Sequence, residues 1–115
     1  MKYFKLKDFN CPCCGKNNMN KDVLSRLDIA RYIAGVKFII SSGYRCVKHN
    51  KEVGGSKDSS HLIGVAVDIK CKKSYNRFRI IYGLILAGFT RIGIGKNFIH
   101  ADYNENKVQE VTWLY

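Results

Sequence analysis

The run Val65-Ala-Val-Asp-Ile69 places a carboxylate in the middle of an apolar, mostly β-branched stretch. Short runs of this composition are typical of β-strands. Because side chains alternate across a strand, the two valines and Ile69 point to one face, and Asp68 points to the other. A carboxylate among apolar neighbours is costly to bury unless it meets a cation or hydrogen-bond donors. The run therefore predicts a strand with one face in the core and Asp68 facing a polar partner.

The run Phe98-Ile-His-Ala-Asp102 has the same character. As a strand, it places His100 and Asp102 on one face and the apolar Ile99 on the other. Two strands are therefore predicted to carry polar side chains on one face and core side chains on the opposite face.

The chain has only three histidines, His49, His61 and His100, and His61 precedes Asp68 by seven residues. His61, Asp68 and His100 form a sensible ligand set for a catalytic zinc, because three protein ligands leave a fourth position for water. Zinc lowers the pKa of that water to about 7, which allows attack on an amide carbonyl at neutral pH. Spacing alone also allows a simpler interpretation, in which the histidines are hydrogen-bonded core residues and Asp68 is a turn residue.

Two helices are predicted from apolar residues that recur every three to four positions. The first spans residues 21–34, where Asn20 can cap the start and Gly35 follows the end. The second spans residues 74–87, with Ser74 as its cap. Its inner face is predicted to consist of Phe78, Ile81, Leu84 and Ile85.

Five strands are predicted from short apolar runs. They span residues 36–40, 65–69, 91–94, 98–103 and 108–115. Tight turns are expected at residues 95–97 and 104–106, and the polar residues 41–60 are predicted to form a functional loop. Because helices and strands do not alternate strictly, we expect an α+β fold with a small, mainly antiparallel sheet and two packed helices. At 115 residues the chain fits one domain, residues 1–115.

The chain is strongly basic, with 20 Lys and Arg against nine Asp and Glu, a formal net charge of +11. Such a charge favours polyanionic partners: nucleic acid, anionic lipid or an acidic cell wall. The lysines are scattered, which argues against a dedicated groove, and an AT-rich genome is an equally good explanation of their number. No apolar stretch is long enough to span a bilayer or to form a signal peptide, so we expect synthesis in the cytoplasm and no membrane insertion.

The five cysteines are an odd number, so at least one has no partner within the chain. Cys11, Cys13 and Cys14 crowd together, whereas Cys46 and Cys71 are isolated. Reduced thiols are expected for a chain without a signal peptide. A structural zinc held by the N-terminal cluster and either Cys46 or Cys71 is one interpretation, although the paired motifs of a zinc ribbon are missing. The same absence, and the lack of a basic helix, argue against a small nucleic-acid binder built on such a zinc.

A ten-residue stretch narrows the function. Ser59-Ser-His-Leu-Ile-Gly-Val-Ala-Val-Asp68 matches the pattern Ser-x-His-x-x-Gly-x-Ala-x-Asp of the zinc D-alanyl-D-alanine peptidases and related endolysins. The other matching segments, in chain order, are residues 4–14, Ser42-Gly-Tyr-Arg45, His49-Asn50, Val53-Gly-Gly55, Gly93-Ile-Gly95, Phe98-Ile-His-Ala-Asp102 and Thr112-Trp113. Over nearly its entire length the chain therefore resembles the compact M15 peptidases, the family of small peptidoglycan-cleaving domains. This resemblance implies the zinc D-Ala-D-Ala peptidase fold, also called hedgehog-like.

By this resemblance, His61, Asp68 and His100 would bind one catalytic Zn²⁺. Arg45 would hold a substrate carbonyl or carboxylate and stabilise the charge that develops on the attacked carbonyl. The simpler interpretation of Arg45 is a salt-bridged loop residue. Ser59 would hydrogen-bond near the metal or the substrate, or would only cap a turn.

The general base is where this sequence departs from the family pattern. Better-known members carry Glu or Asp three positions before the last zinc histidine, and that position here is Asn97. Asp102 shares a strand face with His100, and we favour it as the catalytic base. Two alternatives stay open. Asp102 orients His100 as a hydrogen-bond acceptor, or it binds the metal, as the second histidine does in members with His-x-His.

The resemblance implies a zinc metallopeptidase that hydrolyses peptide bonds next to a D-amino acid in peptidoglycan, as a carboxypeptidase or an endopeptidase. Size and charge favour a monomeric, phage-type endolysin that acts at the cell wall after release by a holin-type partner. Nucleic acid is not an expected partner. Because the acid before His100 is missing, the alternative is a cell-wall-binding module that kept the fold and lost activity.

Overall fold

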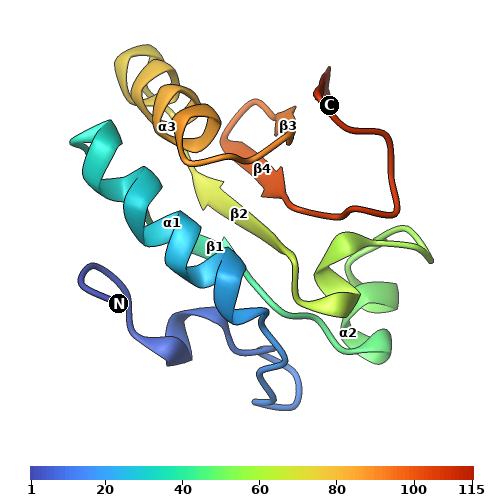
Figure 1. Cartoon of the computed structure of the whole chain (residues 1–115). Coiled ribbons are helices and arrows are strands. Elements are labelled where there is room, and N and C mark those ends of the chain that lie inside the picture. The colour runs from blue at the N-terminus through green and yellow to red at the C-terminus, as the bar shows by residue number, and fades with distance from the viewer.

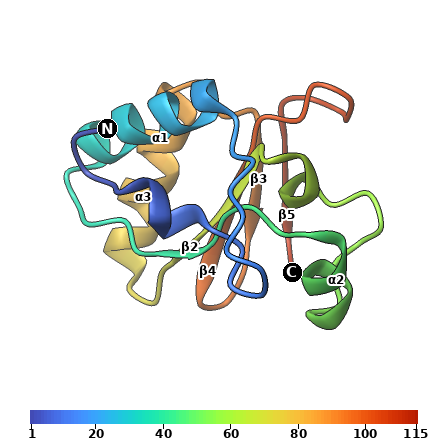
Figure 2. The same cartoon turned by 90° about the horizontal axis from the view of Figure 1, so that it is seen from below.

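The computed structural model describes all 115 residues, and its helices and strands are mixed along the chain (Figure 1). The helices are α1 (Lys21–Ala34), α2 (Val47–Glu52) and α3 (Ser74–Leu86), with two short 3-10 helices, η1 (Leu6–Phe9) and η2 (Ser60–Ile63). The strands are β1 (Ile40–Ser42), β2 (Ala66–Lys70), β3 (Arg91–Ile94), β4 (Phe98–Asp102) and β5 (Val111–Leu114). α1 and α3 pack together on one side of the sheet, and α2 lies on the other side (Figure 2). None of the helices is long and apolar enough to cross a membrane.

The five strands form one sheet in the order β1-β2-β4-β3-β5. All neighbouring pairs are antiparallel except β3 and β5, which are parallel. The expected α+β fold with a mainly antiparallel sheet is therefore confirmed.

The chain leaves β4 differently from the expectation. A turn forms at the predicted place, where the backbone N–H of Lys107 donates to the carbonyl oxygen of Asn104 at 3.2 Å. The chain then crosses to the far side of β3, and the last strand begins at Val111 instead of residue 108. The connection is longer than a tight turn because β3 lies between β4 and β5 in the sheet.

α1 forms over the predicted residues. The side chain of Asn20 accepts hydrogen bonds from the backbone N–H groups of Asp22 and Val23, at 2.8 and 3.1 Å. Gly35 ends the helix with a left-handed φ of 68°. The buried side chains of the helix are Val23, Leu24, Leu27, Ala30 and Ala34.

α3 occupies the predicted residues but is rotated about its axis: of the four side chains predicted on its inner face, Leu84 is buried and Ile81 packs against the core, whereas the other two are exposed. Phe78 and Ile85, predicted on the inner face, are 65% and 57% exposed. The contact with α1 sets this rotation, because a Cβ at Gly83 would collide with the carbonyl oxygen of Ala30. Only glycine allows so close an approach of the two helices. The helix buries Ile80, Gly83 and Leu84.

The strand expected at residues 36–40 is wrong in its bounds. β1 begins only at Ile40, which pairs with Ile69 of β2. The backbone N–H of Lys70, the last residue of β2, bonds to the carbonyl of Ile39. The residues before Ile39 therefore lie beyond the end of β2 and have no strand to pair with.

Two helix starts also differ from the prediction. The loop expected at residues 41–60 contains α2, which begins after Cys46, whose sulfur accepts a hydrogen bond from the backbone N–H of His49 at 3.4 Å. Cysteine is not among the residues that usually cap a helix start, so α2 could not be predicted from its cap. Ser74 is the first residue of α3 and not its cap, since Lys73 occupies that position without a side-chain bond.

Candidate metal centre

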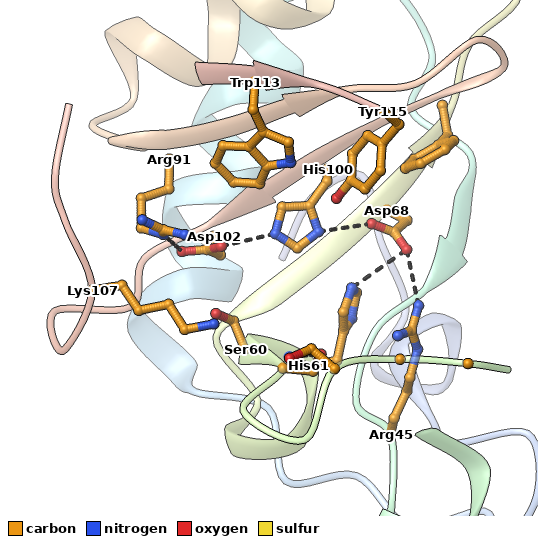
Figure 3. Close-up of a pocket in the computed structure, with 15 residues that line it drawn as sticks. Arg45, Ser60, His61, Asp68, Arg91, His100, Asp102, Lys107, Trp113 and Tyr115 are labelled. Atoms are coloured by element: carbon orange, nitrogen blue, oxygen red, sulfur yellow. Dashed lines mark hydrogen bonds and ion pairs between the residues drawn. The ribbon is translucent and has the colours of Figure 1, made fainter. Parts of the chain in front are cut away.

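Side chains from three segments converge on the sheet face that points away from the core (Figure 3). His61 comes from η2, Asp68 from β2 and His100 from β4. Asp68 Oδ2 lies 3.4 Å from His61 Nε2, and Asp68 Oδ1 lies 3.0 Å from His100 Nδ1. The three potential ligand atoms lie within 4.8 Å of one another. The structure thus brings together the three residues that the sequence pointed to.

The sheet register positions two of these side chains. In the antiparallel pair of β2 and β4, Asp68 lies directly opposite His100. Val67, Ile69 and Ile99 alternate with them and are fully buried in the core. The alternation predicted from the sequence is therefore confirmed, and the paired strands fix both polar side chains on one face.

A short local structure positions His61. η2 starts after Ser59, whose Oγ accepts a hydrogen bond from the backbone N–H of His61 at 3.2 Å. It ends at Gly64, where φ is 72° and a Cβ would collide with the backbone of Asn18. Of the roles considered for Ser59, the structure shows the helix cap, and the Ser59 residue also lines the pocket around the centre.

Each histidine has one ring nitrogen held by an acceptor outside the centre. His61 Nδ1 lies 2.7 Å from the carbonyl oxygen of Gly43, so this nitrogen carries the proton and Nε2 faces Asp68. His100 Nε2 lies 2.8 Å from Asp102 Oδ2, which leaves Nδ1 facing Asp68. Both rings therefore turn one nitrogen toward the same point, as metal-binding histidines do.

The charges of the centre stabilise one another. Burial raises the pKa of Asp68, but hydrogen bonds from His100 and His61 and their charges lower the pKa well below its ordinary value. Burial lowers the pKa of His100, but the hydrogen bonds to Asp102 and Asp68 outweigh it and leave the pKa raised. Without a metal, Asp68 is therefore an ionised carboxylate, and its negative charge favours a cation between the two histidines.

Comparison with known families identifies the chain. The sequence model of a family described as Peptidase M15 matches residues 2–102. The chain belongs to the peptidase M15 family. No curated protein matches it. Peptidases of this family are zinc-dependent in general. The match includes all three converging residues of this M15 peptidase and ends at Asp102, before β5.

The converging residues fit a zinc ion. Two imidazole nitrogens and one carboxylate are zinc ligands in catalytic sites, where three protein ligands leave one position open. The acceptors behind both histidine rings hold those rings in the orientation that ligation needs. The centre also opens on a pocket of about 310 Å³, so a water molecule and a substrate have access.

Asp102 lies behind His100 and is 1% exposed. Its Oδ1 forms an ion pair with Arg91 Nε at 2.9 Å and accepts the backbone N–H of Asn104 at 3.1 Å. Burial raises the pKa of Asp102, but the bond to His100, the Asn104 N–H and the charge of Arg91 outweigh it, so the pKa is lowered. Asp102 Oδ2 binds the ring nitrogen of His100 that faces away from Asp68. Of the three roles considered for Asp102, this geometry favours the one in which it orients His100.

Arg45 lies at the edge of the centre. Its Nη2 donates to Asp68 Oδ2 at 3.1 Å, its Nε donates to Ser42 Oγ at 3.0 Å and its Nη1 donates to Asn50 Oδ1 at 3.3 Å. Asn97, which occupies the place of the family's acid, lines an adjoining cavity together with Arg45 and Asp68.

A row of residues crosses four strands beneath the pocket. Asp68, His100, Gly93 and Trp113 are successive partners in the register of β2, β4, β3 and β5. A Cβ at Gly93 would lie 2.7 Å from the indole of Trp113, so the missing side chain lets the indole approach His100. The two rings lie 5.6 Å apart.

The residues lining the pocket to which sequence reasoning gave no role at the site include Arg91, Lys107, Trp113 and Tyr115. Trp113 and Tyr115 alternate with Thr112 and Leu114, which indicates that the two aromatic side chains share one strand face. The sequence does not indicate that β5 pairs in parallel with β3, so it could not place that face at the pocket.

Proposed function

We propose that this M15 peptidase hydrolyses peptide bonds next to a D-amino acid in the stem peptides or cross-links of peptidoglycan. His61, Asp68 and His100 would hold one Zn²⁺. The observation that carries the proposal is the convergence of these three ligands at a pocket in a member of a peptidase family. A bound zinc supplies a Lewis acid that polarises the scissile carbonyl and lowers the pKa of a water molecule to about 7.

The residues around the ligands keep the donor atoms in place. The carbonyl of Gly43 fixes the tautomer of His61, and Asp102 fixes the ring of His100. Arg91 and the backbone N–H of Asn104 in turn hold Asp102 as a carboxylate. Asp68 and Asp102 are the only carboxylates that line the pocket. We assign Asp102 the role of a positioning residue, for which such an acceptor is well suited.

Arg45 is proposed to bind the substrate. Its guanidinium lines the pocket beside Asp68, and its side chain is 15% exposed. A planar, permanently charged guanidinium binds a carboxylate through two parallel hydrogen bonds and also stabilises charge that develops on a carbonyl oxygen. Either contact would hold the scissile bond of a stem peptide next to the metal ligands.

The charge of the chain supports an anionic substrate. Arg45, Arg91 and Lys107 all line the pocket, in a chain of formal net charge +11. Stem peptides carry free carboxylates, and cell walls carry further anionic polymers, so this charge raises the local concentration of protein at the wall. We propose that the protein acts there as a monomer, after a holin-type partner opens the membrane.

The test is mass spectrometry of purified peptidoglycan after incubation with the protein. The wild type, a chelator-treated sample and a zinc-restored sample are compared with His100→Ala. His49→Ala is the matched control, because it removes the one histidine outside the centre. New peptide fragments are expected with the wild type, with restored zinc and with His49→Ala, and their masses name the cleaved bond. Unchanged muropeptides with zinc bound would instead support a binding module without activity.

A further inference from the structure

The N-terminal cysteines and Cys46 come together although Cys46 lies 32 positions after Cys14 in the sequence. The sulfur atoms of Cys11, Cys14 and Cys46 lie within 4.8 Å of one another. Cys13 Sγ lies 3.9 Å from Cys46 Sγ, at the edge of this group of three. All four are free thiols, as is Cys71, the remaining cysteine.

The spacing of the sulfurs fits a shared metal better than a disulfide. A disulfide requires sulfurs about 2.05 Å apart. Four thiolates around a tetrahedral zinc, at Zn–S distances of about 2.3 Å, have sulfurs about 3.8 Å apart. The distance of 3.9 Å between Cys13 and Cys46 is close to that value.

The backbone around Cys11 and Cys14 has the form of a metal-binding loop. The two residues have the Cys-x-x-Cys spacing that is common among zinc ligands. A turn closes between them, in which the N–H of Gly15 donates to the carbonyl of Cys11 at 2.8 Å and Gly15 takes a φ of 73°. The N–H of Cys11 donates to the carbonyl of Lys16 at 2.8 Å. Both ligands of the pair are thereby held on one small loop.

Backbone N–H groups also point at the sulfurs. The N–H of Cys46 lies 3.5 Å from Cys11 Sγ, and the N–H of His49 lies 3.4 Å from Cys46 Sγ. N–H groups directed at sulfur stabilise a thiolate, which is the form that binds metal.

We propose that Cys11, Cys13, Cys14 and Cys46 form a second metal site, which binds a structural zinc ion through four thiolates. Three sulfur atoms within 4.8 Å of one another and a fourth 3.9 Å from one of them form an all-thiolate ligand set, which suits zinc and leaves no position for water. The site is therefore structural and takes no part in the hydrolysis. It stands independently of the proposed function.

The proposed zinc site lies where the N-terminal segment contacts the segment around Arg45. Cys46 follows Arg45 directly, and the segment before it contacts the N-terminal segment: the N–H of Tyr44 donates to the carbonyl of Phe9 at 2.9 Å. A Cβ at Gly43, whose carbonyl holds His61, would lie 2.7 Å from the backbone of Phe9. A metal that joins Cys11 to Cys46 therefore fastens the segment that holds both Arg45 and His61.

Native mass spectrometry of the full chain, purified under reducing conditions with zinc, tests the site. The wild type is expected to carry two zinc ions, and His100→Ala and Cys14→Ser one each. Cys71→Ser is the matched control, because it removes the cysteine outside the cluster, and it should keep both ions. Cys13→Ser is the second variant if Cys14→Ser does not fold.

Cobalt substitution identifies the ligands of the second ion. Thiolate-to-cobalt charge-transfer absorption is expected in His100→Ala and in Cys71→Ser, and it should be lost in Cys14→Ser or Cys13→Ser. One zinc ion in the wild type that both cysteine variants retain would overturn the proposal. So would a Cys13–Cys46 disulfide in the chain as purified, seen as a mass two hydrogens lower and as three reactive thiols after denaturation.

Discussion

The two groups of side chains that we propose as metal sites are built in opposite ways. In the His–Asp–His centre, two ligands stand on paired strands and both rings are held by acceptors of their own, Gly43 and Asp102. In the cysteine cluster, three ligands share one loop and the fourth precedes a short helix. The paired strands position the side chains of the first group. In the second group, a bound metal would instead join the N-terminal loop to the start of α2 and so stabilise the fold.

The two groups also differ in which residues shift the pKa values of their side chains. Burial raises the pKa of the Cys11 thiol, but the N–H groups of Cys46, Cys14 and Cys13 lower it to about 7. Those partners belong to the cluster itself. Asp68 and His100 are instead stabilised by residues spread over η2, β2 and β4. The comparison shows that the side chains of the His–Asp–His centre are positioned by partners in the surrounding fold. The thiols of the cysteine cluster are positioned mainly by backbone groups of the cluster itself.

The largest difference between the two groups is expected in activity. His100→Ala should lower peptidase activity by at least about a thousandfold, because the substrate carbonyl and the attacking water lose their activating metal. Cys14→Ser, assayed at a temperature at which it is folded, should keep activity per folded molecule within about threefold of the wild type, since a structural metal does not touch the substrate. Initial rates on a stem peptide measure both, and equal losses in the two variants would refute the division of roles.

Asp102→Asn sharpens the account of the His–Asp–His centre. Loss of a carboxylate behind a ligating histidine typically weakens metal affinity by about 10–100-fold. We expect that loss in a zinc competition titration, with activity returning at saturating zinc. A variant that stays inactive with zinc fully bound would show that Asp102 is the general base after all.

In thermal unfolding the order of the two groups reverses. Cys14→Ser should lower stability by about 2–3 kcal/mol, or roughly 10 °C in Tm, because a structural zinc contributes its binding energy to folding. Calorimetry in the presence of zinc measures this. Addition of a strong chelator should remove the difference between wild type and Cys14→Ser, and a difference that persists would assign the loss to packing alone.

The smallest expected effect is on the stability of the metal-free protein at low pH. Asp68 and Asp102 have lowered pKa values in the folded chain, so their contribution to stability is present above the ordinary value of about 3.9 and is lost as pH falls through the folded pKa. The raised pKa of His100 acts oppositely: its contribution is complete below about pH 6.5 and fades as pH rises through the folded pKa. In the metal-free protein, Asp102→Asn should therefore lose less stability than the wild type between about pH 4 and pH 2. Urea titrations at several pH values measure this, and Cys14→Ser should follow the wild type.

The His–Asp–His centre could be predicted from the sequence because each of its three residues lies in a local sequence pattern. The alternation around Asp68 and His100 predicted their faces, and the spacing of His61 from Asp68 matched a family motif. α1 was predictable for the same reason, with its cap at Asn20 and its apolar spacing.

The features that could not be predicted from the sequence depend on contacts between segments that are distant in the chain. The rotation of α3 is set by Gly83 against Ala30, and the place of Trp113 is set by the parallel pairing of β5 with β3. The joining of Cys46, and not Cys71, to the N-terminal cysteines likewise requires the fold.

One titration tests the central claim most directly. Zinc is added stepwise to the chelator-treated wild type and to Cys14→Ser, while native mass and the rate of stem-peptide hydrolysis are followed in the same samples. The account predicts that activity rises with occupancy of the His–Asp–His centre in both proteins, and that Cys14→Ser reaches full activity with one zinc ion. Activity that requires the second ion, or none at full occupancy, would contradict it.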